Sequence, residues 1–168
     1  MGSSALPAQP PSSARTIGTR LGEALKAADQ LAAMDLDADG DMDIIQSLVI
    51  QGEVHWYTND GTGHFGPRTL LLSAGPYPRL NELLDINDDG LVDILLNTSG
   101  SIAWLRNTGL VGFETVETPV TMAFRTTSGD MDGDGDPDVL VLRDNGEFSA
   151  ETVEWSANDG LGNFGPPI

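Results

Sequence analysis

The chain has 168 residues, with 8 basic against 26 acidic side chains and a formal net charge of −18. Such a surface repels nucleic acid and anionic lipid, so we expect no nucleic-acid partner. The sequence has no cysteine and two histidines, His55 and His64, which excludes disulfide scaffolds, thiolate metal sites and multi-histidine metal centres. No apolar run approaches the roughly 18 residues that a membrane-spanning helix needs, so we expect no membrane insertion.

Two features stand out before residue 35. Residues 1–15 are rich in Ser, Ala and Pro and predict a disordered leader. They lack the apolar core of a signal peptide. Residues 21–33 carry apolar side chains at helical spacing, which by itself predicts a short amphipathic helix.

The negative charge is concentrated in three segments, residues 35–43, 85–93 and 130–138, which hold 14 of the 26 acidic residues. The other 12 acidic residues nearly balance the 8 basic ones. Adjacent carboxylates repel each other unless a cation lies among them. All three segments fit the pattern D-x-[DN]-x-D-G-x-x-D, which indicates a metal-binding loop.

The pattern offers side-chain oxygens at loop positions 1, 3, 5 and 9 and a backbone carbonyl at position 7. Hard oxygen ligands without nitrogen or sulfur favour Ca²⁺ over Mg²⁺ or Mn²⁺, so we predict up to three Ca²⁺ ions. The predicted side-chain ligands are Asp35, Asp37, Asp39 and Asp43; Asp85, Asn87, Asp89 and Asp93; and Asp130, Asp132, Asp134 and Asp138. The predicted backbone donors are Asp41, Leu91 and Asp136.

Two details refine this prediction. An EF-hand loop would need a Glu at position 12, where this chain has Gln46, Leu96 and Val141, so an EF-hand is rejected. Asn87 supplies an oxygen without a charge, so the second site is predicted to be the weakest.

A second motif recurs behind each acidic segment, which makes the chain an internal repeat. The motif Trp-x-x-Asn-x-Gly begins at Trp56, Trp104 and Trp155, and a Phe follows each Asn by six residues, at Phe65, Phe113 and Phe164. The Asn-Asp-Gly sequences at 59–61 and 158–160 predict tight turns. Because the Trp recurs at one place in the unit, core packing is the expected role.

Aliphatic and alternating runs predict several short strands in each unit. The expected strands are residues 44–45 with 49–50, 53–57, 69–73, 94–96, 101–105, 139–142 and 151–155. Four short strands in 45–50 residues are typical of a propeller blade.

These motifs resemble the FG-GAP/VCBS repeat family, which includes the blades of the integrin α-subunit propeller. The resemblance covers residues 16–168 and includes Phe-Gly-Pro at 65–67 and 164–166. The second unit departs from it, with Thr108 in place of Asp and Val111 in place of Gly. The resemblance implies an all-β fold of about three four-stranded antiparallel blades, with Ca²⁺ in the loop joining the first two strands, and a cell-surface or secreted location.

The resemblance also implies the domain organisation. The blade units are expected at about 30–74, 80–120 and 125–168, with Gln30–Asp35 an inner strand rather than a helix. Residues 16–22 are expected to be the outer strand of a preceding or ring-closing blade. Three blades are too few for a ring. We therefore expect a partial or oligomer-completed β-propeller, with the remaining blades in cis or a second copy in trans.

The leading functional hypothesis is a calcium-binding, non-enzymatic repeat module that presents loops for adhesion or for a protein or glycan ligand. One alternative is a glycan-binding propeller, with Tyr57 and Tyr77 as candidate stacking residues. Another is the non-catalytic propeller part of a larger secreted enzyme. No catalytic residues are predicted, because neither His55 nor His64 has an identifiable Ser–Asp partner.

Overall fold

The structure is a computed structural model that describes residues 30–73, 77–109, 112–121, 123–144 and 151–168. Within these ranges every regular element of five or more residues is a strand, and the strands form three antiparallel sheets, here called blades 1, 2 and 3. The predicted all-β partial propeller is confirmed. None of the described residues forms a helix long and apolar enough to cross a membrane. The leader predicted at 1–15 and the strand predicted at 16–22 lie outside the described residues.

Blade 1 contains four strands in chain order. They are β1 (Gln30–Met34), β2 (Asp43–Leu48), β3 (Glu53–Tyr57) and β4 (Thr69–Ser73). β1 pairs with β2 along its whole length, from Gln30 opposite Ser47 to Met34 opposite Asp43. The inner strand expected at the start of this blade is therefore present. Residues 30–33 of the segment with helical spacing form strand, because the backbone of β1 is paired along β2, and residues 21–29 lie outside the described residues.

Blades 2 and 3 repeat this order. Blade 2 contains β5 (Arg79–Leu84), β6 (Asp93–Asn97), β7 (Ser101–Asn107) and β8 (Phe113–Thr121). Blade 3 contains β9 (Ala123–Gly129), β10 (Asp138–Asp144) and β11 (Glu151–Ser156), with β10 in the centre.

Blades 1 and 2 have the expected four strands, and blade 3 has three within the described residues. Backbone hydrogen bonds nevertheless occur at the place of a fourth strand, beside β11. Ile168 donates its N–H to the Trp155 carbonyl at 2.9 Å and accepts the Trp155 N–H at 3.3 Å. In blade 1 the residue paired with the equivalent Trp56 is Thr69, the first residue of β4. Ile168 therefore forms the first pair of a fourth strand.

The prediction of a strand at residues 49–50 is wrong. β2 ends at Leu48, and Val49–Gly52 form a turn closed by a 2.9 Å hydrogen bond from the Gly52 N–H to the Leu48 carbonyl. Gly52 has a φ of 76°, which a side chain would strain. Val49 is buried under this turn, so its apolar character reflects burial rather than strand pairing.

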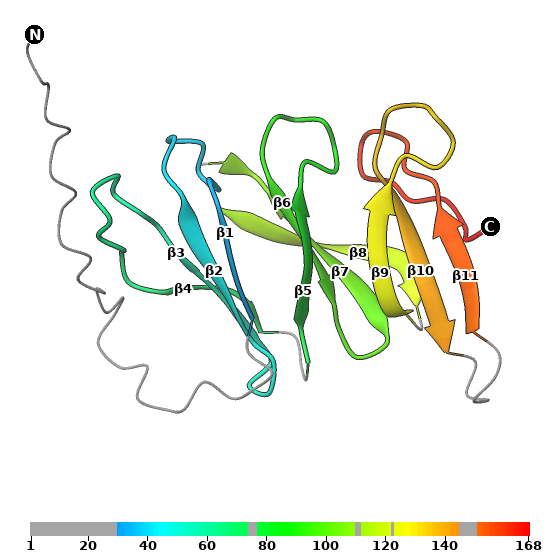
Figure 1. Ribbon diagram of the computed structural model, residues 1–168, viewed down its shortest axis with the longest axis horizontal. Coiled ribbons are helices and arrows are strands. Elements are labelled where there is room, and N and C mark those ends of the chain that lie inside the picture. Colours follow the sequence, from blue (N-terminus) through cyan, green and yellow to red (C-terminus); the bar gives the residue numbers. More distant parts are fainter. Residues whose placement is uncertain (1–29, 74–76, 110–111, 122, 145–150) are drawn as a thin grey trace, which may run out of the picture.

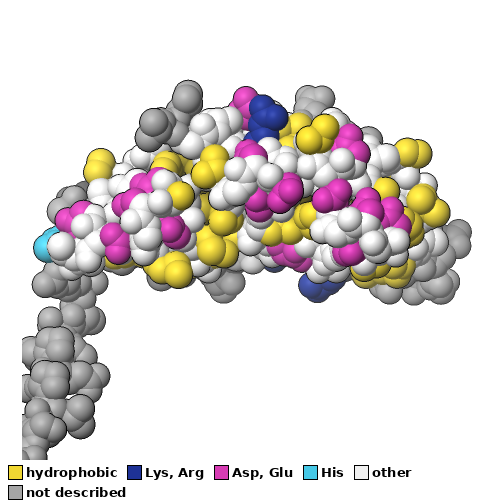
Figure 2. Space-filling model, turned by 90° about the horizontal axis from the view of Figure 1, so that it is seen from above, with side chains coloured by type: hydrophobic (Ala, Val, Ile, Leu, Met, Phe, Trp, Pro, Cys, Tyr) yellow, Lys and Arg dark blue, Asp and Glu magenta, His cyan; other side chains and the backbone are white. Residues whose placement is uncertain are grey.

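The three blades stand side by side, with their first strands β1, β5 and β9 adjacent to one another (Figure 1). The loops that join the first and second strand of each blade all emerge at the same edge, the upper edge in Figure 1. Figure 2 looks down on this edge and shows acidic side chains gathered over all three blades, which follow one another along an arc. The fold therefore brings the three acidic segments to one surface.

The hydrophobic core lies between the blades rather than within one sheet. Blades 1 and 2 enclose one cluster, in which Ile45 and Val54 face Ile94 and Leu105, and all four are fully buried. Blades 2 and 3 enclose the second cluster, around Trp104. Each fully buried aliphatic side chain of this kind contributes about 2 kcal/mol, so a blade is stabilised mainly by its neighbours.

The expectation that the Trp residues pack in the core is met by the first two. Trp56 meets Phe113 of the next blade edge to face, with ring centroids 5.8 Å apart and planes at 83°. Trp104 is 2% exposed between blades 2 and 3. Trp155 occupies the same register position in blade 3, opposite Leu140.

Candidate metal-binding loops

The last acid of each loop, at position 9, is a buried anchor. Asp43, Asp93 and Asp138 are each fully buried and begin the second strand of their blade. In blade 2, the Asp93 carboxylate accepts the Ile86 N–H at 3.1 Å and the Asn107 N–H at 2.6 Å. Blades 1 and 3 repeat both bonds, at 3.2 and 2.8 Å to Asp43 and at 2.7 and 2.8 Å to Asp138. This carboxylate ties the acidic loop to the Asn of the following Trp-x-x-Asn-x-Gly motif.

The first Asp of each loop accepts backbone N–H groups from later residues of the same loop. The Asp35 carboxylate accepts the Asp39 N–H at 3.2 Å and the Gly40 N–H at 3.0 Å. Asp85 accepts the equivalent bonds from Asp89 and Gly90 at 3.2 and 2.7 Å. The turn requires positive φ at position 6, which is glycine in all three loops, with φ of 95° at Gly40.

The fifth position of each loop is a carboxylate that caps the backbone two residues later. Asp39, Asp89 and Asp134 accept the N–H of position 7 at 2.9, 2.9 and 3.0 Å. This bond fixes the backbone at Asp41, Leu91 and Asp136, the residues predicted to offer a carbonyl. The tip of every loop is therefore preformed by its own carboxylates.

The structure brings part of the predicted ligand set together in loops 1 and 3, whereas loop 2 shows no such group of three carboxylates among the described residues. In loop 1, one carboxylate oxygen each from Asp35, Asp37 and Asp39 lie within 4.8 Å of one another. In loop 3 the equivalent group consists of Asp130, Asp132 and Asp138. Asp43 of loop 1 and Asp134 of loop 3 lie outside these groups, although each lies close enough to raise the pKa of a neighbouring loop carboxyl, Asp37 and Asp132 respectively.

Loop 2 differs from the other two at its third position. Asn87 donates its Nδ2 to the Asp89 carboxylate at 2.9 Å. Its Oδ1 atom is buried and has no hydrogen-bond donor among the described residues. A buried amide oxygen without a donor is costly, and a cation would satisfy it.

Electrostatic crowding acts on the loop tips. Partial burial, followed by repulsion from Asp43 and Asp39, raises the pKa of Asp37 above its usual range. Partial desolvation and repulsion from Asp134 raise the pKa of Asp136, and Asp88 of the neighbouring loop adds to this shift. Burial also raises the pKa of Asp93, against the lowering effect of its two N–H donors. These carboxylates hold negative charge in an environment that disfavours it.

The acidic loop contacts the Gly of the Trp-x-x-Asn-x-Gly motif. From the sequence, the loop and the motif were considered separately. A Cβ atom built on Gly61 would lie 2.3 Å from Oδ2 of Asp41, and one on Gly160 would lie 2.5 Å from Oδ2 of Asp136. Both glycines also have positive φ, at 74° and 75°, in the tight turns predicted there. The signal for this contact was that the Trp motif follows every acidic segment, beginning 21, 19 and 25 residues after the first Asp of the loop.

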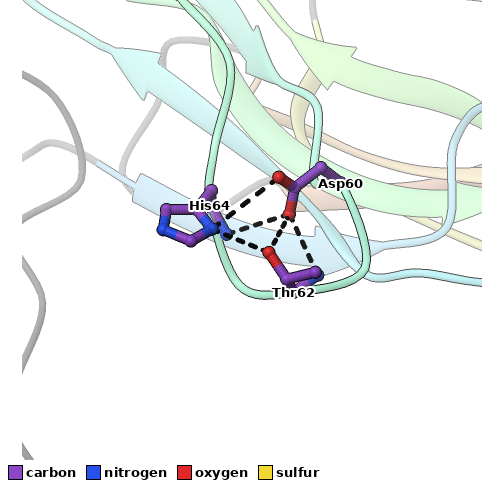
Figure 3. Close-up of polar contacts among 3 residues, drawn as sticks. All are labelled: Asp60, Thr62 and His64. Carbon is purple, nitrogen blue, oxygen red and sulfur yellow. Dashed lines mark hydrogen bonds and ion pairs between the residues drawn. The ribbon is translucent and has the colours of Figure 1, made fainter.

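His64 belongs to the same turn in blade 1 (Figure 3). Thr62 Oγ1 lies 2.7 Å from both Asp60 Oδ1 and His64 Nδ1, and the Asp60 carboxylate also accepts the N–H groups of Thr62 and His64. In a catalytic triad the imidazole lies between carboxylate and hydroxyl and uses both nitrogens, whereas here one nitrogen faces both groups. The arrangement closes a turn. In blade 3, Asn163 closes the equivalent turn on Asp159.

The other aromatic and histidine candidates differ in burial and in their partners. His55 is buried on β3 with Nε2 3.4 Å from the Glu53 carboxylate, and burial followed by the nearby Arg68 charge lowers its pKa. Tyr57 is partly buried and donates to Gln46 at 2.8 Å, so it is a packed residue rather than a free stacking surface. Tyr77 is 55% exposed and has a φ of 73°.

Comparison with known proteins supports this fold. Residues 85–141 match the FG-GAP-like repeat, a span from the first residue of loop 2 into β10. The structure resembles that of an Agrocybe aegerita lectin described for its specific recognition of non-reducing terminal N-acetylglucosamine, with a TM-score of 0.61 and 20% sequence identity. The similarity covers 84% of this chain and 38% of the lectin chain, so this chain spans well under half of that protein. A search of curated proteins gave no match.

Proposed function

Because the chain carries FG-GAP-like repeat sequence on a partial β-propeller, we propose that it is a calcium-binding, non-enzymatic repeat module. In this proposal Ca²⁺ occupies the three acidic loops, and the blades present neighbouring loops for adhesion or for binding a ligand outside the cell. The observation that carries the proposal is the convergence of three carboxylate oxygens within 4.8 Å in loop 1 and again in loop 3.

The donor set suits calcium. The loops supply only carboxylate, amide and carbonyl oxygens, which are the ligands of hard cations. Desolvation and repulsion between neighbouring carboxylates raise the pKa values of Asp37, Asp132 and Asp136, and a bound cation would relieve that repulsion. The buried Oδ1 of Asn87 supports a cation in loop 2 as well. The ion would contact both ends of a loop whose last carboxylate, at position 9, is already fixed by backbone hydrogen bonds.

The proposed location outside the cell fits the calcium that is available there. Ca²⁺ sites in extracellular modules bind at about 10⁻⁴–10⁻³ M, which millimolar extracellular calcium fills and cytosolic calcium does not. At such concentrations each filled site stabilises the fold by roughly 1 kcal/mol. A secreted or cell-surface protein would therefore gain stability from the loops.

A calorimetric titration of chelator-stripped protein with Ca²⁺ tests the proposal. We expect three sites, of which the site in loop 2 is the weakest. The variants Asp35→Asn, Asp85→Asn and Asp130→Asn should each remove one site and leave the other two. Absence of heat and of thermal stabilisation in the wild type would refute calcium binding, and Mg²⁺ at the same concentration is the control for nonspecific charge screening.

A glycan ligand is the second candidate, favoured by the lectin among the similar structures and by exposed Tyr77. An exposed tyrosine held at a strained positive φ is a candidate surface for stacking on a sugar ring. Binding of an N-acetylglucosamine-terminated oligosaccharide, measured with the wild type and with Tyr77→Ala, tests this. Tyr57→Phe is the matched control, because Tyr57 is packed. Equal binding by wild type and Tyr77→Ala would remove Tyr77 as the contact.

A further inference from the structure

The interface between blades 2 and 3 combines a hydrogen bond with a close aromatic contact. The Nδ2 of Asn158 in blade 3 donates to the carbonyl of Ile86 in blade 2 at 2.8 Å. A Cβ atom built on Gly162 of blade 3 would lie 2.1 Å from Cη2 of Trp104 in blade 2, so the indole covers this glycine closely. We call the surface that a blade turns toward the next blade its trailing face, here that of blade 2. The surface that a blade turns toward the preceding blade is its leading face, here that of blade 3.

The hydrogen bond of this interface also joins blades 1 and 2. Asn107 of blade 2 donates to the Leu36 carbonyl of blade 1 at 2.7 Å. In both blades the same Nδ2 donates to a second carbonyl within its own acidic loop, Val92 for Asn107 and Pro137 for Asn158. The Asn of the repeat is therefore a connector from each blade to the one before it.

The trailing face of blade 3 repeats that of blade 2 and is exposed. Met131 and Val153 occupy the positions of Ile86 and Ile102, and Trp155 that of Trp104. Ile86 and Ile102 are 2% and 3% exposed, whereas Met131 and Val153 are 45% and 71% exposed. Apolar residues that every preceding blade buries are left open here.

The leading face of blade 1 carries residues equivalent to those of blade 3. Among the described residues, these lack the partners that their counterparts in blade 3 have. Asn59 donates its Nδ2 to the Met42 carbonyl of its own loop at 3.0 Å, and no described residue supplies the carbonyl of a preceding blade. Gly63 has the position and positive φ of Gly162, and a Cβ built on it meets no atom within 4 Å. This glycine lacks the indole that covers its counterpart.

We propose that these two faces bind each other in separate copies of the chain, with blade 3 of one copy docked head to tail on blade 1 of a second copy. The Asn59 amide then donates to the Met131 carbonyl of the other copy, Trp155 covers Gly63, and Val153 becomes buried. Two copies supply six blades, within the 4–8 of closed propellers. A head-to-tail interface that closes gives a ring rather than a filament.

The polar residues on the leading face of blade 1 are compatible with docking. Gln46 and Tyr57 stand where blade 3 has Val141 and Ser156. Tyr57 donates to Gln46 at 2.8 Å, so the two groups already satisfy each other. Blade 3 buries the smaller Ser156 completely at this position of its own leading face.

Analytical ultracentrifugation of the full chain in millimolar Ca²⁺ tests the proposal. We expect a species of twice the 17.8 kDa monomer mass at micromolar concentration. Val153→Asp on the trailing face and Gly63→Asn on the leading face should each raise the dimer Kd at least tenfold. Asn tolerates positive φ, so Gly63→Asn places a side chain where Trp155 must sit without straining the turn.

Matched controls separate docking from folding. Ile50→Asp places the same charge on an exposed residue of the β2–β3 turn, and Gly100→Asn makes the same change at a glycine with φ of 95° in the β6–β7 turn. Both should remain dimeric. Mixing Val153→Asp with Gly63→Asn should restore a 1:1 dimer, since each retains one intact face. A wild type that stays monomeric, or a dimer that both variants leave unchanged, would overturn the proposal.

Discussion

The base and the tip of each acidic loop use the same residue type for opposite purposes. At the base, Asp93 is fully buried and receives two backbone N–H groups from different parts of the chain. At the tip, Asp89 is exposed and receives the Leu91 N–H and the Asn87 side-chain amide, both from residues two positions away. The base carboxylate therefore holds the blade together, whereas the tip carboxylates shape a short turn and concentrate charge.

This difference shows that an acidic motif can be partly structural. If every carboxylate in the loop served only to bind a cation, none would need to lie inside the fold. Because position 9 anchors the Asn motif in all three blades, this part of the repeat contributes stability with or without a metal ion. Calcium should order the tip most, because the base is already held by two backbone N–H donors, although Asp138 at the base of loop 3 also belongs to the carboxylate group there.

The largest expected effect comes from removing the base. Asp93→Ala leaves the Ile86 and Asn107 N–H groups buried without an acceptor and should cost about 3 kcal/mol in free energy of unfolding. Asp89→Ala, measured in chelator, should cost about 0.5 kcal/mol or less. Urea unfolding of both variants checks this. Equal losses would show that base and tip do not differ as described.

Removal of calcium should have the next largest effect and should act on the tips. With three sites at about 1 kcal/mol each, the wild type in chelator should lose roughly 2–3 kcal/mol relative to millimolar Ca²⁺. Each kcal/mol corresponds to about 2–4 °C in Tm for a chain of this size. Scanning calorimetry with and without Ca²⁺ measures it, and an unchanged Tm would contradict the proposed function.

The three tips can be compared with one another through position 3. Asn87→Asp gives loop 2 the charge of loops 1 and 3 and should tighten its Ca²⁺ affinity by roughly tenfold, about 1.4 kcal/mol. Asp132→Asn is the reciprocal variant and should weaken loop 3 by a similar factor. Calorimetric titration resolves both. An affinity of loop 2 that does not respond to Asn87→Asp would remove position 3 from the ligand set.

The smallest expected effect tests a carboxylate outside the loops that resembles the base. Glu82 on β5 accepts the Thr127 hydroxyl at 2.6 Å and the Ser128 N–H at 2.9 Å, both from β9 of blade 3, and it also accepts the Ser128 hydroxyl. Burial raises its pKa, but these donors outweigh burial and leave the pKa below its usual value. Glu82→Gln should cost about 1 kcal/mol at pH 7.

The pH dependence of that loss has a definite sign. Because the pKa of Glu82 is lower in the folded state, its contribution is fully present above the ordinary value of 4.5 and is lost as pH falls through the folded value. The stability difference between wild type and Glu82→Gln should therefore shrink below about pH 4.5. A difference that stays constant from pH 7 to pH 3 would rule out the ionised form as the acceptor.

Much of the fold could be predicted from sequence, because the repeat supplied three versions of the same pattern. The strands at residues 53–57 and 69–73 have the predicted bounds. The prediction of strand at Val49 and Ile50 is wrong because β-branched residues also occur in turns: Val49 is buried in the turn, whereas Ile50 is 50% exposed. Blade 3 has three strands within the described residues, and its fourth position is marked by the backbone pairing of Ile168 with Trp155.

The sequence by itself determined the repeat, the strand order and the location of the charge, because these follow from residue type and spacing. Only the tertiary structure decided what the repeated residues do. The separation of base from tip depends on which Asp is enclosed by the fold, and that enclosure involves a strand and a turn distant in the chain. The connection of Asn107 to Leu36 spans 71 residues, and no local pattern specifies such a pairing. Burial and hydrogen bonding between blades are properties of their packing, so they became visible only once the blades were placed side by side.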